Sequence, residues 1–391
     1  MVKQQSVSGT GKVRSTRYHP RVDTRWNDYA SIDGLDRPSS LHELSPYLGK
    51  MRPELAAWAI DACTKPGDRV YDPFCGSGTV LLEAQSRGRI ATGSDLNPYA
   101  ILLSRAKLNA SKNSLPSSGS EFIEKYALRV DGKKSTTLTA NVSQELKSMY
   151  HPDTLVSLLA WVRILQDAGD DFGLACLMGI AHHQRPGFLS YPASHTVPYL
   201  RNKSFPVESY PELYEYRDVE SRLQRKVDRA LSRLPDFANV IENGTVKFGN
   251  SGELSGECTF DAIITSPPYM GQLHYGRDNR IRLELLGFPD WQSLDSDVSP
   301  RLNVFLQRSV DWLSAWSRLL KPGGTLSVLV GDKTNTTRRP FAELVANLVL
   351  DSGTVYKETG ISVSPIPSRR RVRKGCEGSS AELLLQFEIV K

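Results

Sequence analysis

The residues best suited to chemistry on a substrate follow a short apolar run at Asp261–Thr265. The run is rich in β-branched residues and predicts a buried parallel strand. It is followed by Ser266-Pro267-Pro268-Tyr269, and because proline cannot continue a strand ladder, the chain must leave the sheet at Ser266. The carbonyls of Ser266 and Pro267 can then accept hydrogen bonds from a substrate amine while Tyr269 stacks on a planar ring. Open α/β sheets bind ligands just beyond the carboxyl ends of their strands, although the tetrapeptide alone also suits an ordinary surface turn.

A second stretch has the context of a ligand-binding loop. A strand is predicted from about Arg69 to Phe74, and a helix follows through about Arg87. Between them lies a glycine-rich turn with the sequence Asp72-Pro73-Phe74-Cys75-Gly76-Ser77-Gly78-Thr79. Gly76 and Gly78 allow the backbone to turn sharply and to approach a ligand closely. A turn of this kind between a strand and a helix indicates a ligand-binding loop.

An acidic residue follows the next predicted strand, where it can give a ligand bound at the loop a second contact. The next predicted strand, Ile90–Gly93, ends at Ser94-Asp95-Leu96. A carboxylate at this position suits the two hydroxyls of a ribose. The spacing alone also fits a nicotinamide or flavin domain, but the glycine pattern is not GxGxxG.

Taken together, the two stretches resemble the motifs of one family. The glycine-rich turn is similar to the first cofactor motif of DNA and RNA amino-methyltransferases. Ser266 to Tyr269 resembles the Ser-Pro-Pro-Tyr motif of the DNA amino-methyltransferases, which methylate the exocyclic amine of cytosine or adenine. The resemblance covers residues 41–110 and 244–391. It implies S-adenosyl-L-methionine as the cofactor, no metal, and double-stranded DNA as the partner, with the target base leaving the duplex. It also admits a cognate restriction endonuclease as a partner.

The resemblance assigns roles to individual residues. The catalytic set is Ser266, Pro267, Pro268 and Tyr269. The cofactor set is Asp72, Phe74, Cys75, Gly76, Ser77, Gly78, Thr79, Asp95, Leu96, Asn250, Tyr47 and Lys50. In this set Asp95 meets the ribose and Asn250 meets the adenine. Tyr47 and Lys50 belong to a segment that wraps the methionine end, although a simple packing helix is an equally good interpretation of that segment.

The residue before the two prolines predicts the target base. In the resembled family it is more often Ser in cytosine enzymes and Asp or Asn in adenine enzymes, so Ser266 favours the N4 amine of cytosine. Adenine N6 is the first alternative, and an RNA amino-methyltransferase is the second. A third is an inactive methyltransferase fold that binds nucleic acid, but the complete motifs argue against it.

The elements that must position these residues follow an alternating strand–helix pattern. Further strands are predicted at Thr245–Phe248, Thr325–Val330, Val355–Val363 and Glu382–Val390, and helices at Glu54–Thr64, Val304–Leu320 and Pro340–Leu350. With its closing hairpin the pattern is similar to a seven-stranded methyltransferase sheet. The predicted fold is therefore α/β and Rossmann-like, with a large, mostly helical insert.

The domain organisation predicted from this pattern has three parts. Residues 1–40 form a flexible basic arm, and residues 41–111 and 244–391 form the catalytic domain. Residues 112–243 form an inserted lobe, too long for a structureless loop, that we interpret as the target-recognition region. Unlike the family pattern, the insert lies between the second and third strands, not next to the catalytic motif. Helices are predicted in it at Leu155–Leu165, Phe172–Ala181 and Asp218–Leu234, and the pair His182-His183 indicates a polar loop, since adjacent side chains point apart.

The basic residues are concentrated in a few places. The net charge is +6, residues 1–25 hold six basic residues against one acid, and residues 333–374 hold nine against three. Such clusters are typical of nucleic-acid surfaces, and a solvated charged face is the alternative. The predicted nucleic-acid contacts are Arg369, Arg370, Arg371, Arg373, Lys374, Arg222, Arg225 and Arg229.

Composition limits the remaining possibilities. No apolar run approaches the ~20 residues of a membrane span, and no signal-peptide core is present. The five cysteines are widely spaced and form no CxxC pair, which indicates neither a disulfide framework nor a zinc site. We expect a cytoplasmic, nucleoid-associated protein.

Overall fold

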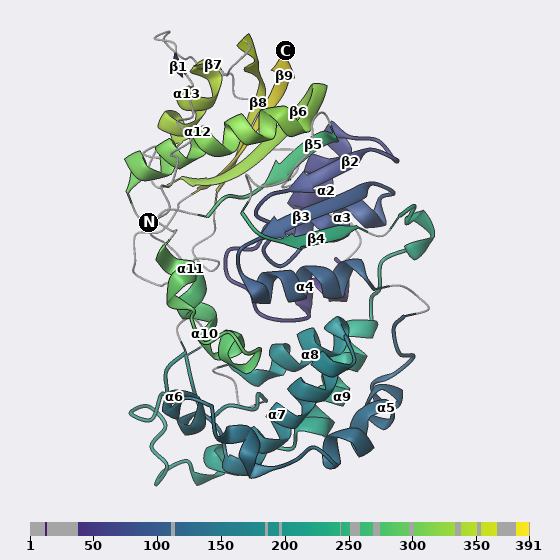
Figure 1. The fold of residues 1–391 in the computed structure, drawn as a ribbon, viewed down its shortest axis with the longest axis vertical. Coiled ribbons are helices and arrows are strands. Elements are labelled where there is room, and N and C mark those ends of the chain that lie inside the picture. Colours follow the sequence, from purple (N-terminus) through teal and green to yellow (C-terminus); the bar gives the residue numbers. More distant parts are fainter. Residues whose placement is uncertain are drawn as a thin grey trace, which may run out of the picture.

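The computed structural model describes residues 12–13, 38–110, 114–183, 187–194, 198–242, 244–250, 259–268, 274–296, 301–332, 338–349, 353–365 and 381–390. A twisted sheet with helices on both faces forms the upper part of the molecule in Figure 1, and a lobe of helices lies below it. The glycine-rich turn and Ser266 belong to the part that contains the sheet.

One mixed sheet contains every strand of the described residues. The strands are β1 (Lys12–Val13), β2 (Arg69–Asp72), β3 (Ile90–Asp95), β4 (Thr245–Phe248), β5 (Phe260–Thr265), β6 (Leu320–Asp332), β7 (Leu348–Val349), β8 (Val355–Pro365) and β9 (Ala381–Val390). Their order is β1-β7-β8-β9-β6-β5-β2-β3-β4. Strands β4, β3, β2, β5 and β6 pair with one another in parallel. Strand β9 pairs antiparallel with both β6 and β8. The predicted seven-stranded sheet is thus confirmed, and in the described part of the chain the short β1 and β7 extend one edge.

The two faces of the sheet follow from the alternation of side chains along each strand. Val70 of β2 packs with α2 (Pro53–Cys63) and α3 (Thr79–Ser86), whereas its neighbour Tyr71 packs with α12 (Leu302–Leu319) and α13 (Arg338–Asn347). Parallel register then aligns the strand ends, since Asp72 pairs with Gly93 of β3. The carboxyl ends of β2, β3 and β5 therefore lie at one edge.

Strand β6 begins earlier than the predicted Thr325. Phe260 pairs with Leu320, whereas Ala262 pairs with Thr325, so the register shifts between these two pairs. The four residues between these two pairs on β6, Lys321 to Gly324, form the irregularity. The strand therefore starts directly after α12 ends at Leu319.

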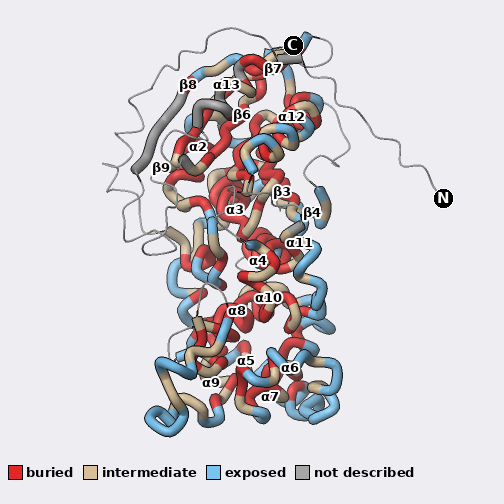
Figure 2. The backbone as a smooth tube through the Cα atoms, turned by 90° about the vertical axis from the view of Figure 1, so that its left-hand side faces the viewer, coloured by how far each residue is buried: buried red, intermediate tan, exposed pale blue. Residues whose placement is uncertain are grey.

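The inserted region forms a helical lobe. Its helices are α5 (Gly119–Asp131), α6 (Gln144–Ser148), α7 (Pro152–Asp167), α8 (Asp171–Ala181) and α9 (Val219–Leu231). Short 3-10 helices are η1 (Ser40–Glu43), η2 (Thr136–Thr139), η3 (Pro211–Tyr214) and η4 (Phe237–Asn239). The predicted helix at Asp218 begins one residue later, because the Asp218 carboxylate accepts from Ser221 N as the N-cap. Burial is continuous from α4 (Pro98–Leu108) into this lobe (Figure 2).

The lobe is built from two separate parts of the chain. Helices α10 (Tyr275–Leu285) and α11 (Gln292–Ser296) follow the catalytic motif in sequence, yet α10 shares the hydrophobic cluster of α7 and α8. Arg282 is 3% exposed and donates to the carbonyls of Met178, at 3.1 Å, and of His182, at 2.9 Å. The Ser143 hydroxyl donates to Glu284 at 2.8 Å. These contacts attach α10 firmly to the inserted helices.

The histidine pair differs from the predicted polar loop. The His182 side chain is buried at the end of α8, where burial lowers its pKa well below the ordinary value. The His183 ring stacks on Phe188 with 4.5 Å between ring centroids. The described residues include no cluster of three or more His, Cys, Asp or Glu side chains arranged to hold a metal ion. None of the described helices has both the length and the apolar character that crossing a membrane requires.

Candidate active site

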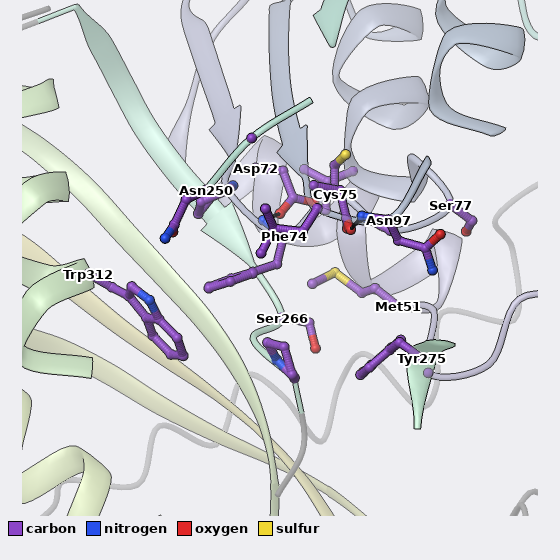
Figure 3. Close-up of a pocket in the computed structure, with 18 of the residues that line it drawn as sticks. Met51, Asp72, Phe74, Cys75, Ser77, Asn97, Asn250, Ser266, Tyr275 and Trp312 are labelled. Carbon is purple, nitrogen blue, oxygen red and sulfur yellow. Dashed lines mark hydrogen bonds between the residues drawn. The ribbon is translucent and has the colours of Figure 1, made fainter. Parts of the chain in front are cut away.

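A cavity of about 610 Å³ lies at the carboxyl ends of β2, β3 and β5 (Figure 3). Most of the described residues that the sequence assigns to the site line it: Tyr47, Lys50, Asp72, Phe74, Cys75, Gly76, Ser77, Thr79, Asp95, Leu96, Asn250, Ser266 and Pro268. Parallel pairing of three strands places both sequence motifs in a single cavity.

The two glycines of the loop have different surroundings. Both have positive φ, 49° at Gly76 and 73° at Gly78, which favours glycine. A Cβ at Gly76 would lie 3.2 Å from the Tyr47 ring, so this glycine admits Tyr47 to the cavity wall. A Cβ at Gly78 would lie 2.7 Å from the Ser104 hydroxyl, and Gly78 does not line the cavity. Its main effect is close packing of α3 on α4.

Side chains of helix α4 hold the glycine-rich loop by donating hydrogen bonds to the carbonyl groups of the loop. The Ser104 hydroxyl donates to the Gly76 carbonyl at 3.0 Å, and the Lys107 ammonium donates to the Ser77 carbonyl. Lys107 is 1% exposed, and burial lowers its pKa well below the ordinary value. The Gly76 N–H in turn donates to Asp95 at 2.9 Å. The loop is therefore held from both sides before any ligand binds.

Two carboxylates with raised pKa values lie in the cavity wall. Burial raises the pKa of Asp72 to about 7, although hydrogen bonds from the Thr265 hydroxyl and the Phe74 N–H oppose the shift. Burial raises the pKa of Asp95 to about 6, opposed by backbone N–H donors that include Asn97 at 2.9 Å. Near neutral pH, both groups can change charge when a cationic or hydrogen-bonding ligand enters.

Aromatic rings form two walls of the cavity. At one end the Phe74 ring meets Trp312 edge-on, with 4.8 Å between centroids. At the other end the Tyr47 and Tyr275 rings lie 6.4 Å apart. Figure 3 places Ser266 between Trp312 and Tyr275. Planar or cationic groups therefore have aromatic partners on both sides of the catalytic motif.

Some residues of the cavity lining carry a buried polar atom without a partner. Within the described part of the chain, Ser77 Oγ, Thr79 Oγ1 and Asn97 Nδ2 have no hydrogen-bond partner, and all three residues line the cavity. Buried polar groups in proteins are nearly always paired. Because these atoms have almost no accessible surface, a ligand in the cavity would reach them only after the side chain rotates.

Sequence reasoning missed part of the lining. The missed residues include Met51, Asn97, Tyr275, Leu294, Phe305, Arg308, Asp311, Trp312 and Arg318. Met51 and Asn97 stand beside predicted site residues in the sequence, and this adjacency was a usable signal. The others come from α10, α11 and α12, and only tertiary packing brings them to the cavity.

The remaining predicted residues have other locations. Pro267 is buried and does not line the cavity. Lys50 lines it, but its ammonium donates to the His42 carbonyl at 2.9 Å. Arg222, Arg225 and Arg229 lie on α9 in the lobe, away from the cavity lining. Tyr269 and the run Arg369, Arg370, Arg371, Arg373 and Lys374 lie outside the described residues.

Comparison with known proteins supports the same family. Residues 21–105 match the N6/N4 family model described as DNA methylase. The Type II methyltransferase M.MvaI of Kocuria varians is 32% identical over 359 residues, covering 83% of this chain and 71% of the relative. M.MjaII of Methanocaldococcus jannaschii is 21% identical over 402 residues, covering 78% and 74%.

Two further matches are weaker or shorter. A tRNA (guanine(10)-N2)-dimethyltransferase of Methanothermobacter thermautotrophicus is 42% identical over 52 residues, 13% of this chain and 16% of the relative. A solved SAM-dependent methyltransferase from Methanosarcina mazei gives a TM-score of 0.35 at 10% identity over 85% of this chain and 97% of that one, which supports no further conclusion. The match to M.MvaI extends over most of both chains. The chain belongs to the DNA amino-methyltransferase family.

Proposed function

We propose that this protein transfers a methyl group from S-adenosyl-L-methionine to the N4 amine of cytosine in double-stranded DNA. The observation that carries the proposal is the shared cavity: Ser266 and Pro268 line it together with Asp95 and the glycine-rich loop. A methyl donor held by the loop and an amine held at Ser266 would therefore meet in one enclosed space.

The residues of the cavity fit the proposed cofactor. Asp95 would accept hydrogen bonds from the ribose hydroxyls, and Asn250 and Leu96, which line the same cavity, would contact the adenine. Ser77 and Thr79 line the cavity at the glycine-rich loop and would pack near the polar methionine end. When bound, S-adenosyl-L-methionine supplies an electrophilic methyl group on a sulfonium.

Ser266 and Pro267 would prepare the amine for attack. The lone pair of an exocyclic amine is delocalised into the base, which makes the nitrogen a poor nucleophile. A hydrogen bond from the amine to the Ser266 hydroxyl would turn the lone pair out of the ring plane, and the Pro267 carbonyl would accept a second one once entry of the base exposes it. Tyr269 is expected to stack on the base, which must leave the duplex to reach the cavity.

Ser266 also supports cytosine as the target base. A neutral hydroxyl can accept from the cytosine amine or donate to the neighbouring ring nitrogen. Adenine N6 is the alternative target, and the short tRNA-enzyme match keeps an RNA substrate as a second one.

The DNA partner is proposed to contact two further regions. The lobe of α5–α9 together with α10 and α11 would recognise the target sequence, because α10 links it directly to the cavity. The run from Arg369 to Lys374 and the arginines of α9 would contact phosphates. A cognate restriction endonuclease is the further partner proposed for this enzyme.

The proposal is tested by methyl transfer. The purified protein is incubated with S-adenosyl-L-methionine carrying a tritiated methyl group, and with either genomic DNA or total RNA. The nucleosides are then separated and identified by mass spectrometry. We expect N4-methylcytosine from DNA, formed about tenfold more slowly or less by Ser266→Ala. N6-methyladenine would overturn the target base, label in RNA alone would overturn the DNA substrate, and no transfer to either would overturn the proposed activity.

A further inference from the structure

We propose that Tyr275, together with Tyr47, binds the sulfonium cation of the cofactor, so that the cavity distinguishes charged S-adenosyl-L-methionine from the neutral S-adenosyl-L-homocysteine. The inference rests on the proposed function and adds a residue that the sequence motifs do not contain. Its role would be recognition of charge beside the reacting methyl group.

The positions of the two rings carry the inference. Tyr275 is the first residue of α10 and lines the cavity, and Tyr47 enters the cavity from the segment after η1. Their ring centroids lie 6.4 Å apart with 34° between the planes. In Figure 3 Tyr275 lies on the far side of Ser266 from Trp312. A cation placed between the glycine-rich loop and Ser266 would lie next to these rings.

The chemistry of the surroundings suits a cation. The face of an aromatic ring attracts a positive charge within ~6 Å of its centroid, and the attraction grows when the site is desolvated. Asp72 and Asp95 line the same cavity, and their carboxylates add attraction of the same sign. Burial, followed by the nearby Asp95, raises the pKa of Tyr47 well above its ordinary value, so that ring stays neutral. A neutral tyrosine keeps the electron-rich face that a cation needs.

Tyr275 is held in place by a buried anchor on its own helix. Arg282, two helical turns further along α10, donates to the carbonyls of Met178 and His182. Its guanidinium lies 5.7 Å from the Tyr99 ring, and the Tyr99 ring lies 5.8 Å from that of Tyr47. Both rings of the proposed site thus belong to one packed framework. Little ordering entropy would be lost when the ligand binds.

The proposed contact would be lost at the moment of transfer. The carbon–sulfur bond would break with its electron pair on sulfur while the amine nitrogen forms the new bond to carbon, and that nitrogen would then pass one proton to water. The cofactor product is therefore a neutral thioether, which no longer attracts the two rings. Weaker binding of the product would favour its release.

Calorimetry on both ligands tests the inference. The dissociation constants of S-adenosyl-L-methionine and S-adenosyl-L-homocysteine are measured for the wild-type protein, Tyr275→Leu, Tyr275→Phe and Tyr199→Leu. Tyr199 is an exposed tyrosine outside the cavity lining and serves as the matched control. We expect Tyr275→Leu to weaken S-adenosyl-L-methionine binding about tenfold and S-adenosyl-L-homocysteine binding less than twofold. Tyr275→Phe and Tyr199→Leu should bind both ligands like the wild type.

The outcomes separate the inference from the proposed function. Equal weakening of both ligands, or of neither, in Tyr275→Leu would overturn cation recognition while the methyl-transfer activity of the wild type stands. A wild-type protein that binds neither ligand would overturn the proposed function and the inference with it. If Tyr275→Leu fails to fold, Tyr47→Leu provides the same comparison from the other ring.

Discussion

The Thr265 hydroxyl donates a 2.7 Å hydrogen bond to Asp72, joining the last residue of β5 to the last residue of β2. Both residues are buried. Ser266 follows the first of them directly, and the glycine-rich loop follows the second. This one bond therefore fixes the catalytic motif relative to the cofactor loop, and it also stabilises the charged form of a carboxylate whose pKa is raised to about 7.

Thr265→Val should shift the acid limb of the pH–activity profile to higher pH. Valine keeps the shape of the threonine side chain but removes the hydroxyl that donates to Asp72. The pKa of Asp72 therefore rises further, and its carboxylate becomes protonated at a higher pH than in the wild type. We expect kcat/KM for methyl transfer to fall several-fold at pH 7 and to recover at pH 8.5 to 9. Thr325→Val is the control, because within the described residues its hydroxyl has no hydrogen-bond partner. Profiles that coincide for the two variants would remove Thr265 from this role.

Asp95→Ala should weaken cofactor binding. The carboxylate lines the cavity and is proposed to accept from the ribose, and loss of a hydrogen bond to a charged group costs ~1.5–3 kcal/mol. We expect the dissociation constant for S-adenosyl-L-methionine to rise at least tenfold in calorimetry. Asp68→Ala, at a carboxylate outside the cavity lining, is the matched control. Unchanged affinity in Asp95→Ala would place the ribose elsewhere.

Cofactor affinity should depend on pH through these two carboxylates. Burial raises the pKa of Asp72 to about 7 and that of Asp95 to about 6, so the free protein holds protons there at mildly acidic pH. A cationic cofactor favours the charged carboxylates, so its affinity should increase as pH rises from 5 to 8, with release of protons on binding. Calorimetry in buffers of different ionisation enthalpy measures that release. A flat profile would contradict the assigned carboxylates.

Ser266→Ala should affect the chemical step and spare the cofactor. Its hydroxyl is proposed to orient the amine mainly in the transition state, so the methyl-transfer rate should fall about tenfold or more with nearly unchanged cofactor affinity. Ser314→Ala, on the α12 wall of the same cavity, is the matched control and should keep its rate. Full activity of Ser266→Ala would leave the Pro267 carbonyl and Tyr269 as the groups that hold the base.

Replacing Arg370, Arg371 and Arg373 with alanine should weaken binding to all DNA sequences alike. Each lost phosphate contact should also reduce the slope of log K against log salt by about one. Fluorescence anisotropy of labelled DNA, measured at salt concentrations from about 50 to about 300 mM, gives the binding constants from which this slope is obtained. Arg225→Ala with Arg229→Ala, on α9, shows whether the lobe contributes separately. A wild-type slope in the triple variant would indicate a solvated loop.

The features predicted best from the sequence are those determined by residues that are neighbours in the chain. The glycine-rich turn and Ser266 each follow a strand directly and Asp95 is the last residue of β3, so locating the strand also locates the side chain. Strand β4 has the predicted bounds Thr245–Phe248 because its ends are marked by local polar and glycine residues. The parallel register then brought these residues to one cavity, as strand-end positions require.

The features predicted least well from the sequence are the contacts that depend on tertiary packing. Trp312 belongs to an amphipathic helix, and nothing in that pattern says which side chain meets Phe74. Gly78 looks like a ligand glycine, but its neighbour in space is Ser104. Tyr275 reaches the cavity because Arg282 anchors α10 to the lobe, and this contact joins residues 100 positions apart in the chain.

The anchoring of α10 also determines how the protein can be engineered. Exchanging the helical lobe between relatives would mean grafting residues 114–242, which are continuous in sequence. Such a chimaera would separate Arg282 from the carbonyls of Met178 and His182 that it pairs with. A buried charge left without its partners costs ~3–5 kcal/mol. The transplantable unit is therefore discontinuous: residues 114–242 must move together with 274–296, even though the catalytic strand lies between them.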